Sequence, residues 1–273
     1  WISGTFPPVA YSIGSGRRVL LERFIYGSYC VPLLFSSSAP FSGKIAKHFR
    51  AFSTLLFPET CPGCGRLDTL LCDRCRGIFL RAPTAVDAAT ALGKDAGQVF
   101  TLSLYRQQAR GVILAMKHSR GFYYQQLPFF IGAVAARSIA LSVSQPTLIC
   151  PAPSTSHFGS SPIRSTAGRL AAGLAAGLNA CGGKVRLAGL LELKAGSKKQ
   201  AGRSYQERLR GRAGSMRLAA PGELDFSKRV LLVDDVITTG ATIREAVRVI
   251  NEAQTQVVGV FSLGVAERNL KRA

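Results

Sequence analysis

Polar residues with a phosphate-binding composition follow a short apolar run in the C-terminal third of the chain, where residues 230–243 read VLLVDDVITTGATI. A glycine lets the backbone approach a bound group closely, and threonine hydroxyls add hydrogen-bond donors. A helix that begins directly afterwards forms an anion-binding site with its free N–H groups and its dipole. This pattern predicts a site for a ribose 5-phosphate, formed by Thr238, Thr239, Gly240, Ala241 and Thr242.

Two carboxylates, Asp234 and Asp235, precede this expected phosphate site in the sequence. They would repel a phosphate, so we expect them to face ribose hydroxyls or a Mg²⁺ ion, and a 5-phosphorylated ribose satisfies both halves of the motif. Neither a Walker sequence nor a G-x-G-x-x-G fingerprint accompanies a strand-to-helix turn. The alternative interpretation is a simple acidic turn capped by threonine. It does not explain why two acids, two threonines, a glycine and a further threonine follow one another in this order.

Four cysteines have the spacing of metal ligands: Cys61, Cys64, Cys72 and Cys75. Two C-x-x-C pairs can complete a tetrahedral S₄ shell suited to Zn²⁺, which is a structural shell because no coordination position stays open. The alternatives are two disulfides or a redox pair. An odd total of 7 cysteines argues against a secreted disulfide framework.

The phosphate motif resembles the phosphoribosyl-pyrophosphate motif of type I phosphoribosyltransferases, and its combination with four upstream cysteines resembles the ComF family of competence-associated proteins. The resemblance runs from about Leu56 to Leu263 and includes Met116-Lys117, Pro151-Ala-Pro153 and Lys199-Gln-Ala-Gly202. It implies that Asp234 and Asp235 are the catalytic carboxylates of a Mg²⁺-dependent glycosyltransferase. It also implies a pyrophosphate side formed by Arg164, Lys199 and Arg208.

One segment departs from the family pattern. After Pro-x-Pro the family usually carries an Arg-Gly-aromatic-Asn-Gln run, whereas this chain reads Arg-Ser-Thr-Ala-Gly-Arg at 164–169. The C-terminal phosphate motif is intact, whereas the opposite wall of the site differs from the family. The departure therefore weakens the prediction of catalysis more than the prediction of ligand binding.

The elements that must position these residues alternate between strands and helices, which predicts an α/β fold with a mostly parallel sheet. The run Val230–Val233 is apolar without alternation, as in a strand buried on both faces, and we expect it to end at the two acids. A helix is expected over 241–253 and another over 170–178. The other expected strands are Val99–Leu104, Thr147–Cys150, Val185–Leu191 and Val257–Leu263.

The domain organisation follows from these elements. A type I phosphoribosyltransferase-like domain is expected at 98–268, preceded at 44–82 by a helix and a zinc-ribbon-like module. Residues 1–43 are rich in Ser, Gly and Pro and are expected to form a poorly ordered leader; a degenerate secretory signal is the alternative. The cysteine pattern favours a reducing, cytoplasmic location, and no apolar stretch approaches the roughly 20 residues of a membrane span.

The net charge of +20 is concentrated in residues 101–212, which hold 16 basic and 2 acidic residues. This charge distribution is compatible with an enzyme that transfers phosphoribosyl from phosphoribosyl pyrophosphate to an unknown acceptor. Another is a non-catalytic accessory protein of DNA uptake that binds single-stranded DNA along the basic stretch. A surface of solvated arginines is the plainer alternative. The sequence leaves open the acceptor and the oligomeric state.

Overall fold

The structure is a computed structural model, and it describes residues 22–26, 29–33, 59–140, 145–154, 162–194, 214–219, 222 and 229–269. The chain divides into two compact units, Trp1–Phe57 and Pro58–Ala273. In the first unit, β1 (Glu22–Tyr26) pairs with β2 (Tyr29–Leu33) as an antiparallel hairpin within the segment expected to be a leader. The helix expected within residues 44–56 lies outside the described residues.

The second unit is built on a six-stranded sheet of order β3-β4-β10-β9-β5-β6. All neighbouring strands run parallel except β3 and β4, which are antiparallel. The six strands are β3 (Thr84–Val86), β4 (Gln98–Thr101), β5 (Thr147–Pro151), β6 (Val185–Leu187), β9 (Arg229–Ile237) and β10 (Gln256–Val265). The predicted α/β fold with a mostly parallel sheet is therefore confirmed.

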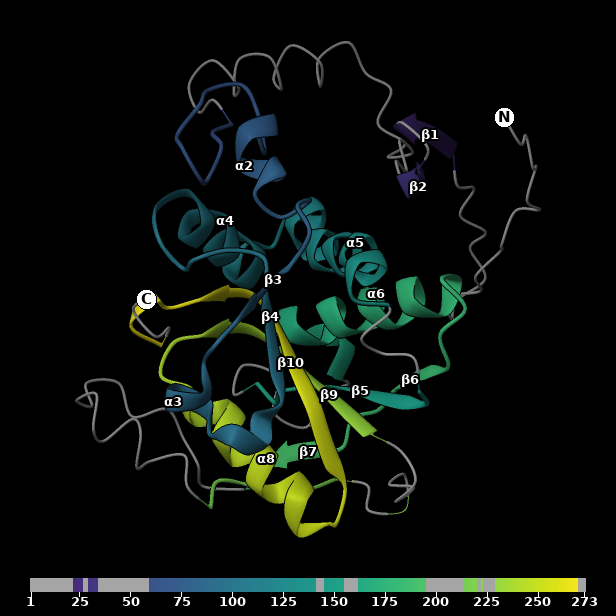
Figure 1. The fold of residues 1–273 in the computed structure, drawn as a ribbon. Coiled ribbons are helices and arrows are strands. Elements are labelled where there is room, and N and C mark those ends of the chain that lie inside the picture. Colours follow the sequence, from purple (N-terminus) through teal and green to yellow (C-terminus); the bar gives the residue numbers. More distant parts are fainter. Residues whose placement is uncertain are drawn as a thin grey trace. The chain divides into compact units, whose positions relative to one another are not determined.

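Helices cover both faces of this sheet (Figure 1). One face is covered by α4 (Gln107–His118), α5 (Phe122–Ile139) and α6 (Thr166–Ala180). The other face is covered by α8 (Ala241–Glu252) and α3 (Ala89–Leu92), together with a small antiparallel hairpin of β7 (Leu191–Leu193) and β8 (Met216–Leu218). Residues of β9 alternate between the two cores, Leu231 and Val233 in one and Val230 and Leu232 in the other, which explains its continuous apolar run.

The bounds of several predicted elements differ from the structure, and among them the strand expected at Val99–Leu104 is β4, which ends at Thr101. The strand β9 continues through both acids to Ile237, because β10 pairs with it as far as Val265. The expected strand Val185–Leu191 is two strands, since β6 joins the main sheet and β7 joins β8. The helix expected from 170 begins at Thr166, because Ser165 caps it by accepting a hydrogen bond of 2.9 Å from the Gly168 N–H.

The topology changes direction between β5 and β9. From β5 the chain passes through α6, on one face, to β6 at one edge of the sheet, whereas from β9 it passes through α8, on the opposite face, to β10. In open α/β sheets, ligands bind outside the carboxyl ends of the strands at such a switch point. The last β5 residue, Pro151, is paired with Val233, so Asp234 and Asp235 lie directly beyond the end of β5.

Candidate functional site

The two acids have different surroundings although they are adjacent on β9. Asp234 turns back on its own strand, where its Oδ1 accepts a hydrogen bond of 2.8 Å from the Asp235 N–H. Asp235 reaches the face covered by α4, and its Oδ1 lies 2.9 Å from the Nζ of Lys117. Burial works to lower the pKa of Lys117, but the carboxylates of Asp235 and Asp234 outweigh it and raise that pKa. Lys117 therefore stays charged over the ordinary pH range.

The loop formed by Thr238, Thr239 and Gly240 joins β9 to α8 and is held by two side chains, Asn269 from a distant segment and Arg244 from the first turn of α8. Asn269 Nδ2 donates to the carbonyl oxygens of Ile237 at 3.1 Å and Thr238 at 2.9 Å. Arg244 donates to the carbonyl oxygen of Thr239 at 3.3 Å and also to that of Ala91. In a trans peptide the N–H points opposite to the carbonyl. The N–H groups of Thr239 and Gly240 are therefore turned away from the two clamping side chains.

Gly240 adopts the left-handed conformation at the N-cap of α8, with φ of 74°. A Cβ atom there would lie 2.6 Å from the Ala91 carbonyl oxygen and 2.7 Å from Leu92 Cδ2, so only glycine fits without displacement. Thr239 Oγ1 accepts from the Ala241 N–H at 3.3 Å. The first turn of α8 thus begins at a tightly packed loop, and Thr242 in that turn is half-buried.

A second helix N-terminus stands across the switch point. Arg164 ends η4 (Pro162–Arg164) and is exposed, and α6 begins two residues later. Thr166 Oγ1 donates to the carbonyl oxygen of Met116 at 3.4 Å, so the start of α6 contacts the end of α4 next to Lys117. Lys199 and Arg208, also expected on the pyrophosphate side, lie outside the described residues.

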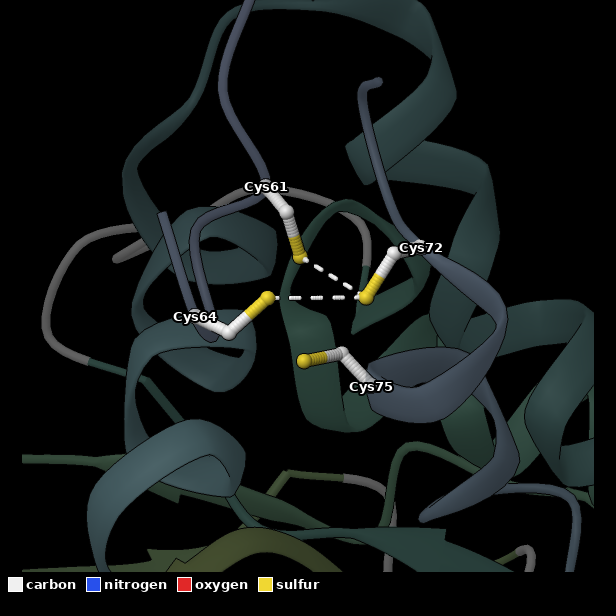
Figure 2. Close-up of side chains that lie close together, drawn as sticks. All are labelled: Cys61, Cys64, Cys72 and Cys75. Carbon is white, nitrogen blue, oxygen red and sulfur yellow. Dashed lines mark hydrogen bonds between the residues drawn. The ribbon is translucent and has the colours of Figure 1, made fainter. Parts of the chain in front are cut away.

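Figure 2 shows the thiol groups of Cys61, Cys64, Cys72 and Cys75 converging on one point. Their four sulfur atoms lie within 4.8 Å of one another, and Cys72 Sγ is 3.5 Å from that of Cys64 and 3.7 Å from that of Cys61. A tetrahedron with metal–sulfur distances of about 2.3 Å has edges of about 3.8 Å. This set could hold a metal ion such as Zn²⁺.

The thiols of this cluster differ in acidity. Burial works to raise the pKa of Cys61, but backbone hydrogen bonds from Cys72, Cys64 and Gly63 outweigh it and lower the pKa to about 6. Burial and the neighbouring sulfur atoms raise the pKa of Cys75. Gly63 admits the fourth sulfur, because a Cβ atom there would lie 2.6 Å from Cys75 Sγ. Outside the cluster, Cys150 is buried and Cys181 is exposed.

The cysteine module lies on the face of the domain that α4 and α5 cover. Gly111 of α4 allows the backbone of Pro62 to pack directly on the helix, since a Cβ atom at position 111 would clash with the Pro62 carbonyl oxygen. From α5, Tyr124 Oη donates to the Leu70 carbonyl oxygen at 2.5 Å. The module therefore rests on α4 and α5, and α4 runs from beneath it to Lys117.

Residues 163–268 match the family model of the phosphoribosyl transferase domain. The match spans the start of α6, the loop at 238–240 and the strands β9 and β10, and it supports a type I phosphoribosyltransferase-like domain. A search of curated proteins finds no match to this chain. Within the part of the chain that the structure describes, no helix has both the length and the apolar character needed to cross a membrane.

Two residues of the site were not foreseen as functional from the sequence, and a third, Lys117, was predicted only as part of the family resemblance. Arg244 and Asn269 carry no local motif, and their contacts to the 238–240 loop depend on the packing of α8 and of η6 (Glu267–Asn269). Lys117 ends a helix, a place where a cation is favourable in any protein. Only its position relative to β9 distinguishes it.

Proposed function

We propose that the domain binds phosphoribosyl pyrophosphate, or a related ribose 5-phosphate ligand, together with Mg²⁺. The observation that carries this proposal is the position of the Asp234–Thr242 segment at the switch point between β5 and β9. The 5-phosphate would lie at the 238–240 loop and the start of α8, and the ribose hydroxyls would donate to Asp234 and Asp235. Two helix N-termini beside one switch point suit a sugar that carries anionic groups at both ends.

We further propose that the protein is a phosphoribosyltransferase. An acceptor nucleophile would form a bond to C1 of the ribose while the bond from C1 to the diphosphate oxygen breaks, and the electron pair would leave with diphosphate. The side chains Arg164, Lys199 and Arg208 are proposed on the diphosphate side, where Mg²⁺ would neutralise charge when bound. Catalysis would then rest on positioning and on stabilising the charge of the leaving group.

The cysteine module supports a more specific proposal, that the chain is a ComF-type protein of the cytoplasm with a structural Zn²⁺. The cluster lies in the same compact unit as the transferase-like domain. A second candidate function, binding of single-stranded DNA during competence, is favoured by the excess of 16 basic over 2 acidic residues in 101–212. Its test is salt dependence, since affinity for a single strand must fall steeply as salt rises.

Calorimetric titration with phosphoribosyl pyrophosphate and Mg²⁺ tests the main proposal. We expect saturable binding by the wild type and a large loss of affinity when Asp234→Asn and Asp235→Asn are combined. Asp95→Asn is the control, because it removes one exposed carboxylate of η1 (Lys94–Ala96). A wild type that binds no ligand would overturn the proposal, and undiminished binding by the double variant would remove the two acids from the site.

A further inference from the structure

Lys117 is a charged residue of the site that the proposed function has not yet used. It is the penultimate residue of α4, which ends at His118. Its ammonium group makes a 2.9 Å ion pair with Asp235, 118 positions further along the chain. Its side chain is 33% exposed and that of Asp235 is 16% exposed. A favourable interaction with the dipole of α4 would explain a lysine at this position, but it would not explain a contact with β9.

Lys117 lies close to two parts of the proposed site. On one side is Asp235, at the carboxyl edge of the sheet. On the other side is the start of α6, because Met116 accepts a hydrogen bond of 3.4 Å from Thr166 Oγ1. Arg164 lies two residues before Thr166. Lys117 therefore pairs with the acid proposed to hold the ribose and directly follows the residue through which α4 contacts the start of α6.

A cation of the protein near this place favours the charge balance of the site, in addition to the Mg²⁺ proposed above. Asp234 and Asp235 together carry two negative charges, and a diphosphate brought beside them would be repelled. A lysine ammonium has three donors on a flexible stem, so one group can keep its bond to a carboxylate and donate to a phosphate oxygen as well. Among the described groups that raise the pKa of Lys117, Asp235 acts most strongly, followed by Asp234 and then Tyr105.

We propose that Lys117 recognises the diphosphate end of the ligand and bridges it to Asp235. The inference rests on the proposed function, because it takes phosphoribosyl pyrophosphate as the ligand. It assigns to α4 a residue of the binding site, in addition to those of the 234–242 segment and of α6. It also explains how two carboxylates tolerate a polyanion beside them.

The test compares two ligands that differ only in the diphosphate, ribose 5-phosphate and phosphoribosyl pyrophosphate, by calorimetry at one saturating Mg²⁺ concentration. For Lys117→Gln we expect the affinity for phosphoribosyl pyrophosphate to fall about tenfold or more, as for the loss of a charge-assisted hydrogen bond. The affinity for ribose 5-phosphate should stay within about twofold. Lys117→Arg should keep most of the affinity for phosphoribosyl pyrophosphate, because it keeps the charge.

Lys94→Gln is the matched control, since it removes one exposed cation from η1 and should change neither affinity. Lys117→Met serves as a second variant if Lys117→Gln lowers the free energy of unfolding, and inorganic diphosphate serves as a third probe. Equal loss for both sugar ligands, or loss for neither, would overturn the role of Lys117 while leaving the proposed function intact. Failure of the wild type to bind either sugar ligand would overturn both.

Discussion

The side chain of Asn269 donates a hydrogen bond of 2.9 Å to the carbonyl oxygen of Thr238, 31 residues earlier in the chain. Asn269 lies in η6, after the last strand, and is only 4% exposed. Its amide group also reaches the carbonyl oxygen of Ile237, which additionally accepts from the Ala266 N–H at 2.9 Å. The chain that follows β10 thus fixes the loop that begins after β9.

Replacement of Asn269 should loosen this loop. Asn269→Ala leaves the Thr238 carbonyl without its buried donor, which should lower the free energy of unfolding by about 1–3 kcal/mol. Ribose 5-phosphate binding should weaken as well, because the N–H groups of Thr239 and Gly240 lose their fixed orientation. Urea unfolding and calorimetry measure the two effects. Asn251→Ala, at the exposed end of α8, is the control, and equal stability of the two variants would contradict the clamp.

Gly240→Ala tests the packing of the same loop. The substitution imposes the left-handed strain of an L residue, about 1–2 kcal/mol, and adds a clash with the Ala91 carbonyl oxygen and Leu92. Gly182→Ala isolates the strain, because Gly182 has φ of 84° and nothing within 4 Å of its missing Cβ. We expect Gly240→Ala to cost roughly 1–3 kcal/mol more than the control in urea unfolding. Similar costs would show that the loop has room to shift.

The sequence predicted those parts of the site that lie on one continuous segment. The run of apolar residues, acids, threonines and glycine at 230–243 encodes a strand, a loop and a helix in order, and local chemistry is enough to interpret it. The end of the strand was wrong by four residues, because pairing between Val265 and Ile237 extends β9 past both acids. Hydrogen bonds to a neighbouring strand outweighed the weak strand preference of aspartate.

Contacts between distant segments were beyond the reach of the sequence. The pair Lys117–Asp235 exists because α4 packs on the face of the sheet to which Asp235 points, and no spacing rule relates the two positions. The clamp by Asn269 likewise depends on where the chain turns after β10. The four cysteines could be predicted as a group because their ligand spacing is local, whereas their support by Gly111 of α4 is a tertiary contact.

The cysteine cluster predicts metal dependence. Purified protein should contain about one Zn²⁺ per chain, and Cys75→Ser should lose most of it, because one of four ligands is removed. Unfolding should then begin at a lower temperature, since metal affinity of a structural site contributes to folding. Cys181→Ser, at an exposed cysteine outside the cluster, should keep both metal and stability. Metal analysis that finds no Zn²⁺ in the wild type would contradict the prediction.

The contact between the cysteine module and α4 can be tested with a pair of glycine substitutions. Gly111→Ala places a methyl group against the Pro62 carbonyl oxygen, and we expect it to lower the free energy of unfolding by about 1–3 kcal/mol and to speed the loss of Zn²⁺ to a chelator. Gly77→Ala in α2 (Asp73–Gly77) is the control, because nothing lies within 4 Å of its missing Cβ. If chelation proceeds at one rate in both variants, the module does not depend on this contact.

An ion pair on the opposite face, between the buried Glu245 and the partly exposed Arg248, makes stability depend on pH. Glu245 in α8 has a side chain only 3% exposed, and it holds Arg248 through two bonds of 2.9 Å and accepts from the Met216 N–H of β8 at 3.2 Å. Burial works to raise the pKa of Glu245, but the bonds from Arg248, Met216 and Gly214 outweigh it and hold that pKa below its usual value of 4.5. Glu252 binds the same arginine, but its side chain is 63% exposed.

The lowered pKa fixes the direction of the pH effect. Because the folded protein binds the Glu245 proton less tightly than the unfolded chain, the carboxylate stabilises the fold above about pH 4.5, and this contribution disappears as the pH falls through the folded pKa. Glu245→Gln should therefore lower the free energy of unfolding by roughly 1–3 kcal/mol at pH 7, and the gap to the wild type should close toward pH 3. Glu252→Gln should change it by less than about 1 kcal/mol at either pH, as for other exposed pairs. Urea unfolding across this range decides the matter, since a gap of constant size would mean that Glu245 acts through packing and not through its charge.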